Sequence, residues 1–496
     1  MKKILKSLFI VALLMNISCA EDYLDTVPTD AVSEEIVFTT TKNAMTALNG
    51  IHRALLLRYD SQGQAGEGAV MIMREVLAED VVMTSTGNNW YVSTSRWLNH
   101  NVENSNDVRF VWRFYYKLIG NANMIIDKID GAEGPQDEKD EIKGQALAYR
   151  AWAHFNLVQL FAKRYDAAGN NSQMGVPIVL EPITEGSARN TVEEVYTQIN
   201  TDLDAAISLL DENRNAKSHF NINVVNGIKA RVLLTQGKFV DAATYAKSAR
   251  GGYDLMSESD LYGGFNNVEN PEWIWGSKQV DDQQTYFASF FAYMSLNFSS
   301  TNIRGNPKAI SKKLYDMISD SDYRKGLWDP NASDPDLRDP FIDEMTASNF
   351  AKNDYMNRKF IAQGGASSVG DVPYMRASEM YLLEAEALAR SGNNAAAASV
   401  LMEFMAARDP EYTLPANSGD GLIQEIMIQR RIELWGEGFR FYDLKRLNLP
   451  LDRTGSNHVQ SVINNKFTEP AGTNNWQWQI PLDELNANDN MVQNPS

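Results

Sequence analysis

The strongest constraint on the fold of this chain is the helical spacing of its apolar residues. Apolar side chains separated by three or four positions share one face of an α-helix. Such runs begin at Ala44, Val108 and Ile142, and each lasts several turns. Thr191 followed by Glu194 forms a capping box, which marks the start of another helix. These patterns predict a mainly α-helical protein.

Two predicted helix pairs share a pattern of small residues. The spacing is seven and then five positions in both pairs: Ala230, Gly237 and Ala242 in the first, and Ala385, Gly392 and Ala397 in the second. Small residues let antiparallel helices approach closely, and the glycine can end the first helix in a left-handed turn. The pattern resembles the tetratricopeptide repeat. We therefore expect a tetratricopeptide-like helical-repeat scaffold.

Long irregular segments interrupt this scaffold. The stretches 166–190, 251–307 and 328–340 are rich in proline, glycine, asparagine and aspartate and lack a sustained helical period. Trp273 and Trp275 are expected to pack inward from one of a few short strands. Long loops on a rigid frame are where binding residues usually lie.

The first residues predict secretion. Three lysines precede an apolar run from Leu8 to Met15, which is too short to span a bilayer. We predict a signal peptide over residues 1–18 and lipid attachment at Cys19, with ordinary secretion after cleavage nearby as the alternative. Cys19 is the only cysteine, so a disulfide within the chain is excluded. Residues 19–496 are expected to form one domain, with a helical part over about 19–250 and a loop-rich and C-terminal part over about 251–496.

The charge of the mature chain excludes some partners. Removing residues 1–18 would leave 43 basic and 64 acidic residues, a net charge of −21. Phosphate backbones repel such a protein, so nucleic-acid binding is disfavoured. It also has no cationic attraction to lipid headgroups, so membrane attachment should depend on the lipid.

The sequence offers little for catalysis. The five histidines are scattered, and no nucleophile elbow, phosphate-binding loop or dinucleotide fingerprint occurs. Glu433 and Glu437 lie one helical turn apart and raise the possibility of glycoside hydrolysis. However, four arginines crowd them, and ion pairing would lower the carboxylate pKa values, whereas a general acid needs a raised one. We expect structural ion pairs here, from the segment that contains Arg430, Arg431, Arg440 and Arg446.

No cofactor or metal site is predicted. The run Asp329, Asn331, Ser333 starts like a calcium loop, but Asp334 stands where glycine is needed and Pro340 where the last ligand would be. A structural calcium ion elsewhere stays open, without a motif to support it.

The C-terminal segment resembles a known family. RRIELWGEGFRFYDLKR, residues 430–446, is similar to the hallmark of the SusD/RagB family of surface glycan-binding lipoproteins from Bacteroidetes-type bacteria. Further resemblance lies in EDYLDTVPTDAV near the N-terminus, NPEWIWGSKQ, YMRASEMYLLEAEALARSGN and the closing WQWQIPLDELNANDN. The resemblance implies a non-catalytic, lipid-anchored protein at the cell surface, on the outer membrane. It implies binding of an oligo- or polysaccharide and its delivery to a SusC-like TonB-dependent transporter.

Sugars bind on aromatic platforms beside amide and carboxylate groups. Two polar stretches provide these outside the helices, and the candidate ligand-binding residues in them are Asn88, Asn89, Trp90, Tyr91, Tyr286 and Phe287. Nearby Phe290, Phe291 and Tyr293 are expected in the core. Three alternatives stay open: a surface glycoside hydrolase, a nutrient-binding subunit for peptide or glycopeptide, and a scaffold that binds only protein.

Overall fold

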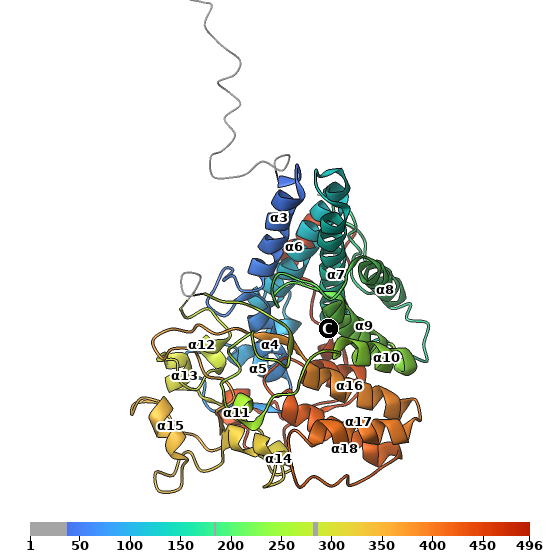
Figure 1. The fold of residues 1–496 in the computed structure, drawn as a ribbon. Coiled ribbons are helices and arrows are strands. Elements are labelled where there is room, and N and C mark those ends of the chain that lie inside the picture. The colour runs from blue at the N-terminus through green and yellow to red at the C-terminus, as the bar shows by residue number, and fades with distance from the viewer. Residues whose placement is uncertain (1–36, 183–184, 281–285) are drawn as a thin grey trace, which may run out of the picture.

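The computed structural model describes residues 37–182, 185–280 and 286–496 (Figure 1). The predicted signal peptide and Cys19 lie outside these residues. Helices dominate and the strands are short, as predicted. Within the described ranges, no helix combines the length and the apolar character that crossing a membrane would need.

The longer helices are α3 (Thr41–Ala54), α4 (Gly66–Leu77), α6 (Asn106–Lys128), α7 (Gln136–Phe161), α8 (Val192–Leu209), α9 (Ile222–Thr235), α10 (Phe239–Ala249), α16 (Ala377–Arg390), α17 (Asn394–Met405) and α18 (Gly419–Glu433). The shorter helices are α5 (Val92–Ser95), α11 (Glu258–Leu261), α12 (Phe291–Met294), α13 (Thr301–Arg304), α14 (Lys312–Tyr315), α15 (Pro340–Met345), α19 (Arg440–Arg446), α20 (Gln460–Ile463) and α21 (Leu482–Ala487). The strands are β1 (Val81–Met83), β2 (Trp273–Gly276), β3 (Lys308–Ile310), β4 (Trp328–Asp329), β5 (Met356–Asn357), β6 (Pro373–Arg376), β7 (Leu451–Asp452) and β8 (Thr468–Glu469).

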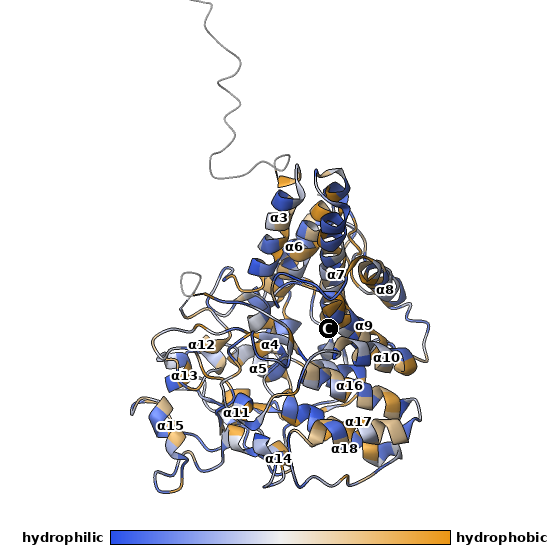
Figure 2. Ribbon diagram, in the orientation of Figure 1, coloured by the Kyte–Doolittle hydropathy of each residue, from blue (hydrophilic) through white to orange (hydrophobic). Residues whose placement is uncertain are grey.

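The predicted helix signals are confirmed. Ala44, the first residue of the earliest apolar run, is fully buried on α3. At the start of α8, Glu194 N donates to Thr191 Oγ1 (3.2 Å) and Thr191 N donates to Glu194 Oε2 (2.7 Å). Figure 2 shows α7 as hydrophilic near its start, and its later turns lie in the core.

The two repeat-like pairs form one stack. Gly237 ends α9 with a φ of +72° and Gly392 ends α16 with a φ of +85°, so both adopt the predicted left-handed turn. The four alanines of the pattern are fully buried. Helix α10 packs directly on α16, although residues 250–376 separate them in the chain (Figure 1). The helical scaffold is therefore continuous in space where it is interrupted in sequence.

The longest irregular segment, residues 277–372, begins and ends at the same pair of strands. Strand β2 pairs with β6 in an antiparallel ladder. The loop-rich segment between them supplies three strands of a sheet of order β1-β3-β5-β4, and the remaining strand, β1, follows α4. Trp273 and Trp275 on β2 are buried, as predicted. The described residues of 166–190 contain no helix or strand, and 251–307 contains only short elements.

Candidate functional site

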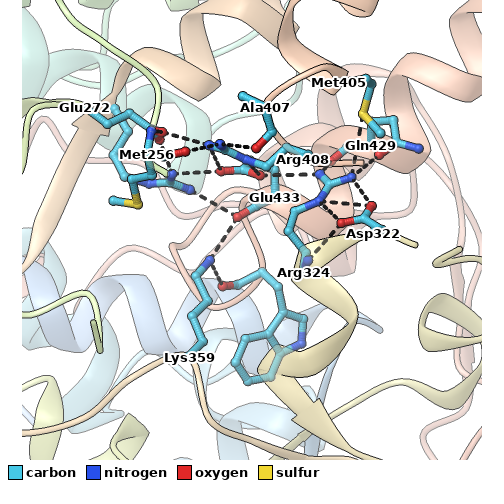
Figure 3. A network of polar contacts seen from close by, with 12 residues as sticks. Met256, Glu272, Asp322, Arg324, Lys359, Met405, Ala407, Arg408, Gln429 and Glu433 are labelled. Carbon is cyan, nitrogen blue, oxygen red and sulfur yellow. Dashed lines mark hydrogen bonds and ion pairs between the residues drawn. The ribbon is translucent and has the colours of Figure 1, made fainter. Parts of the chain in front are cut away.

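Glu433, at the end of α18, and Glu437, four residues later, are buried in a network of charged side chains. Figure 3 shows the part of this network around Glu433. Glu433 Oε1 accepts from Arg376 Nη1 (2.8 Å), and Glu437 Oε1 accepts from Lys359 Nζ (2.6 Å). The network holds four cations and four carboxylates: Arg324, Lys359, Arg376 and Arg408 with Glu272, Asp322, Glu433 and Glu437. Both glutamates are thus fully engaged within the protein.

The electrostatics of this network oppose acid catalysis by Glu433. Burial alone would raise the pKa of its carboxyl, but Arg408, Arg376 and Arg324 hold that pKa well below its usual range. A carboxylate kept ionised in this way has no proton to give to a leaving group. The structural interpretation of this pair is confirmed.

The predicted source of the arginines was wrong. The guanidiniums around Glu433 come from distant segments, whereas the four arginines near it in sequence contact other carboxylates. The ion pairs of these four are Arg430–Asp443, Arg431–Asp80, Arg440–Glu79 and Arg446–Glu386. Arg430 and Arg431 lie in the last turn of α18 and Arg440 and Arg446 lie on α19, and all four side chains pair with carboxylates other than Glu433.

The loop 84–91 is held in a fixed conformation. Thr84 Oγ1 donates to the carbonyl of Pro307 (2.8 Å), and Asn88 Nδ2 donates to Thr301 Oγ1 on α13. Asn89 and Tyr91 have φ values of +67° and +61°, in the left-handed region that asparagine tolerates better than most residues. These turns present Trp90 at a fixed position between the loop and the core.

Trp90 is half-buried, and its ring packs against Gly63 and Tyr293. A Cβ added to Gly63 would come within 3.0 Å of Trp90 Cε3, so the ring lies directly against that glycine. The edge of Tyr293 meets the indole, with ring centroids 6.2 Å apart. Because the Trp90 ring is already held in place, little side-chain entropy of Trp90 would be lost when a ligand stacks on it.

Tyr91 does not provide a second platform. Its side chain is only 6% exposed, its hydroxyl donates to the carbonyl of Gly63 (3.0 Å), and its ring packs on Tyr293. The left-handed turn at Tyr91 directs the side chain inward. Tyr91 therefore lines the cavity described below without exposing a ring face, and its contact with a ligand stays a prediction. The core placement of Phe290, Phe291 and Tyr293 is confirmed.

Trp90 borders a cavity of about 610 Å³. Amides and hydroxyls dominate its wall, and two exposed apolar side chains, Leu98 and Val102, flank it. Its one charged side chain is Asp107, whose Oδ2 accepts from Thr94 Oγ1 (2.8 Å) and Asn99 Nδ2 (2.6 Å). The wall consists of Ser61, Gly63, Asn89, Trp90, Tyr91, Ser93, Leu98, Asn99, Val102, Asn104, Ser105, Asn106 and Asp107.

Sequence reasoning missed most of this wall. The stretch LNHNVENSND, residues 98–107, carries four asparagines within eight positions, and this is the signal that could have revealed the wall. Apolar surfaces beside uncharged amides and hydroxyls suit a neutral, polyhydroxylated ligand.

Tyr286 and Phe287 form a separate exposed pair. They are 55% and 43% exposed, and Phe287 packs against Phe298 with ring centroids 5.9 Å apart. Neither residue borders the cavity beside Trp90. The structure therefore divides the sequence candidates: Asn89, Trp90 and Tyr91 surround one cavity, while Tyr286 and Phe287 lie on another segment.

Within the described residues, no three histidine, cysteine, aspartate or glutamate side chains are grouped to hold a metal ion. At the calcium-like run, Asp329 accepts from the backbone N–H groups of Asn331 and Asp339 (both 2.9 Å), which forms a turn.

Comparison with known proteins gives consistent matches along the chain. Residues 22–234 match a family model described as starch-binding and associating with the outer membrane, and residues 343–496 match the model of the SusD family. SusD-like protein P2 of Formosa agariphila is 25% identical over 99% of this chain and 98% of its own length.

Solved structures share the fold. A SusD-like carbohydrate-binding protein from Bacteroides vulgatus has a TM-score of 0.78 and 27% identity, covering 91% of this chain and 97% of its own. A laminarin-binding SusD-like protein has a TM-score of 0.69 at 21% identity, covering 92% of this chain and all of its own.

Proposed function

The chain belongs to the SusD family, and on that premise we propose that it binds a neutral oligo- or polysaccharide without cleaving it. The observation that carries the proposal is the cavity beside Trp90. Its fixed indole offers a platform for the apolar face of a sugar ring, and its asparagines and serines offer partners for hydroxyls. No basic side chain borders it, so an anionic glycan would have no counter-charge there.

The remaining parts of the function follow from the family. We propose that residues 1–18 are removed, that Cys19 carries a lipid, and that residues 19–496 act as one domain at the cell surface. The bound glycan would pass to a SusC-like TonB-dependent transporter in the outer membrane. The matched description of outer-membrane association supports this location.

The binding proposal is tested on the soluble form that starts at Ala20. Affinity electrophoresis against starch, laminarin and other neutral glycans, with alginate as an anionic comparison, should show retardation by a neutral glycan. Trp90→Ala should weaken that binding about tenfold, since loss of one aromatic platform costs about 1.4 kcal/mol. The melting temperature should stay nearly the same, and Trp90→Phe should retain most of the affinity.

The outcomes separate the alternatives. Equal affinity of wild type and Trp90→Ala would exclude this cavity as the glycan site and would favour the exposed pair Tyr286 and Phe287. Release of reducing ends would establish a hydrolase instead. Binding of peptides or glycopeptides without glycan binding would establish the other nutrient class, and binding of the transporter alone would establish a protein scaffold.

A further inference from the structure

Asp107 is the only charged side chain that borders the cavity beside Trp90. It lies in the first turn of α6, where the positive end of the helix dipole favours a negative charge. Arg109, the nearest basic residue in the sequence, pairs with Asp483 (3.8 Å) and donates to Asn106 Oδ1 (2.7 Å). The carboxylate of Asp107 therefore has no cationic partner among the described residues.

One oxygen of this carboxylate is engaged within the protein. Asp107 Oδ2 accepts from Thr94 Oγ1 (2.8 Å) and from Asn99 Nδ2 (2.6 Å). The backbone N–H of Asp107 donates to Ser105 Oγ (3.2 Å). Thr94 is buried and Asn99 is half-buried, so these bonds fix the orientation of the carboxylate before a ligand arrives.

The other oxygen, Asp107 Oδ1, is free. It accepts no hydrogen bond from the described residues, and it is not one of their buried atoms that lack a partner. Since Asp107 as a whole is only half-buried, Oδ1 is open to solvent. Hydrogen bonds to an ionised acceptor are about twice as strong as bonds between neutral groups. The cavity thus contains a fixed, strong acceptor for hydroxyl groups.

Asp107 lies close to the support of the Trp90 ring. The hydroxyl of Tyr91 donates to the carbonyl of Gly63 (3.0 Å), and the Trp90 ring packs against the same glycine. Burial, Tyr293 and the negative charge of Asp107, in that order, raise the pKa of the Tyr91 hydroxyl well above its ordinary value. Because Trp90 and Asp107 border one cavity, a sugar that stacks on the indole can turn its hydroxyls toward the carboxylate.

We propose that Asp107 determines the specificity of the glycan site: its Oδ1 accepts from hydroxyls of the sugar stacked on Trp90, and its charge excludes sugars that carry a carboxylate. This inference rests on the proposed function and narrows its substrate class to glycans with free hydroxyls and no uronic acid. Like charges brought together at an interface strongly disfavour a wrong partner. No basic side chain borders the cavity to offset that repulsion.

The test compares neutral glycans with the same glycans after their C6 alcohols have been oxidised to carboxylates. The probes are starch, laminarin and mannan, and binding to the soluble form is measured by affinity electrophoresis at about 0.15 M salt, which screens distant charges. Wild type should bind the neutral form about a hundredfold more tightly than the oxidised form.

Asp107→Asn keeps the shape of the side chain. Its amide oxygen can accept from Thr94 and Asn99, and its N–H₂ group then replaces Oδ1 at the cavity. The variant should bind the neutral glycan about tenfold more weakly and should prefer it over the oxidised form by only about tenfold. A purely structural role for Asp107 would change both affinities by the same factor. Asp107→Ser should narrow the preference in the same way, and it provides the test if Asp107→Asn does not fold.

The matched control is Asp241→Asn. Asp241 lies in the first turn of α10, is exposed, and does not border the cavity. The change removes the same charge from the same kind of helix position, so it controls for the general repulsion between an acidic protein and an anionic polymer. This variant should keep the wild-type preference.

The outcomes separate this inference from the proposed function. Equal binding of neutral and oxidised glycan by wild type, an unchanged preference in the Asp107 variants, or the same narrowing in Asp241→Asn would overturn the inference and leave the glycan site in place. Absence of binding to every neutral glycan would overturn both.

Discussion

Glu433→Gln should destabilise the protein strongly. Glu433 accepts from Arg376 Nη1 at 2.8 Å, from Arg408 Nε and Nη2 at 3.0 and 3.1 Å, and from Arg324 Nη1 at 3.3 Å. The change removes one of four negative charges that balance four positive ones, and it turns an amide N–H₂ toward guanidinium donors. Removing one partner of a buried ion pair typically costs about 3–5 kcal/mol.

The assay is urea unfolding of the soluble form, followed by tryptophan fluorescence, with thermal unfolding as a second measurement. For a chain of this length, 1 kcal/mol corresponds to about 1 °C, so the melting temperature should fall by about 3–5 °C. Glu344→Gln is the control, because Glu344 is exposed, and it should change stability by less than about 0.5 kcal/mol. A loss below about 1 kcal/mol for Glu433→Gln would refute the reasoning that this network depends on its charge balance.

Two further predictions concern acid stability and the N-terminus. Burial lowers the pKa of all five histidines. The pKa falls to about 4 for His219, to about 3 for His100, His154 and His458, and well below its ordinary value for His52. The unfolded chain therefore binds more protons below pH 6.5, and stability should fall between pH 6.5 and 4 by about 1.4 kcal/mol per pH unit for each histidine. Burial raises the pKa of Glu75 to about 7, so the folded chain takes up one proton there and offsets the effect of one histidine. A urea unfolding midpoint that is equal at pH 7 and pH 5 would contradict the predicted loss of stability. Cys19→Ala should release the protein from the membrane fraction, and an intact mass that matches an unmodified Cys19 in wild type would exclude the lipid.

The local structure was predictable because its causes are local. Apolar spacing sets the buried face of a helix, a capping box sets its start, and a glycine that must adopt positive φ sets its end. Thr191 with Glu194, and Gly237 and Gly392, act through contacts within a few residues, so the sequence alone reveals them.

The long-range arrangement was not predictable in the same way. The partners of Glu433 come from segments up to 109 residues away, and no spacing rule relates them. Tyr91 has a φ of +61° in a loop that a hydrogen bond from Asn88 ties to the distant Thr301, and no local pattern predicts this. The sequence of residues 98–107 indicates only a polar loop, and its place in the cavity wall with Trp90 depends on the fold.

The pairing of β2 with β6 has a consequence for how the excursion between them can vary. The entropic cost of closing a flexible loop grows only with the logarithm of the loop length. Doubling the length of the segment 277–372 between the paired strands would therefore cost about 0.6 kcal/mol. The repeat stack beneath would not have to move, because α10 and α16 already touch. Insertions in the exposed loops of this segment should therefore be tolerated as long as Arg324 and Lys359 keep their places in the buried network. The surface that the segment carries can then be remodelled for a new ligand while the scaffold stays the same.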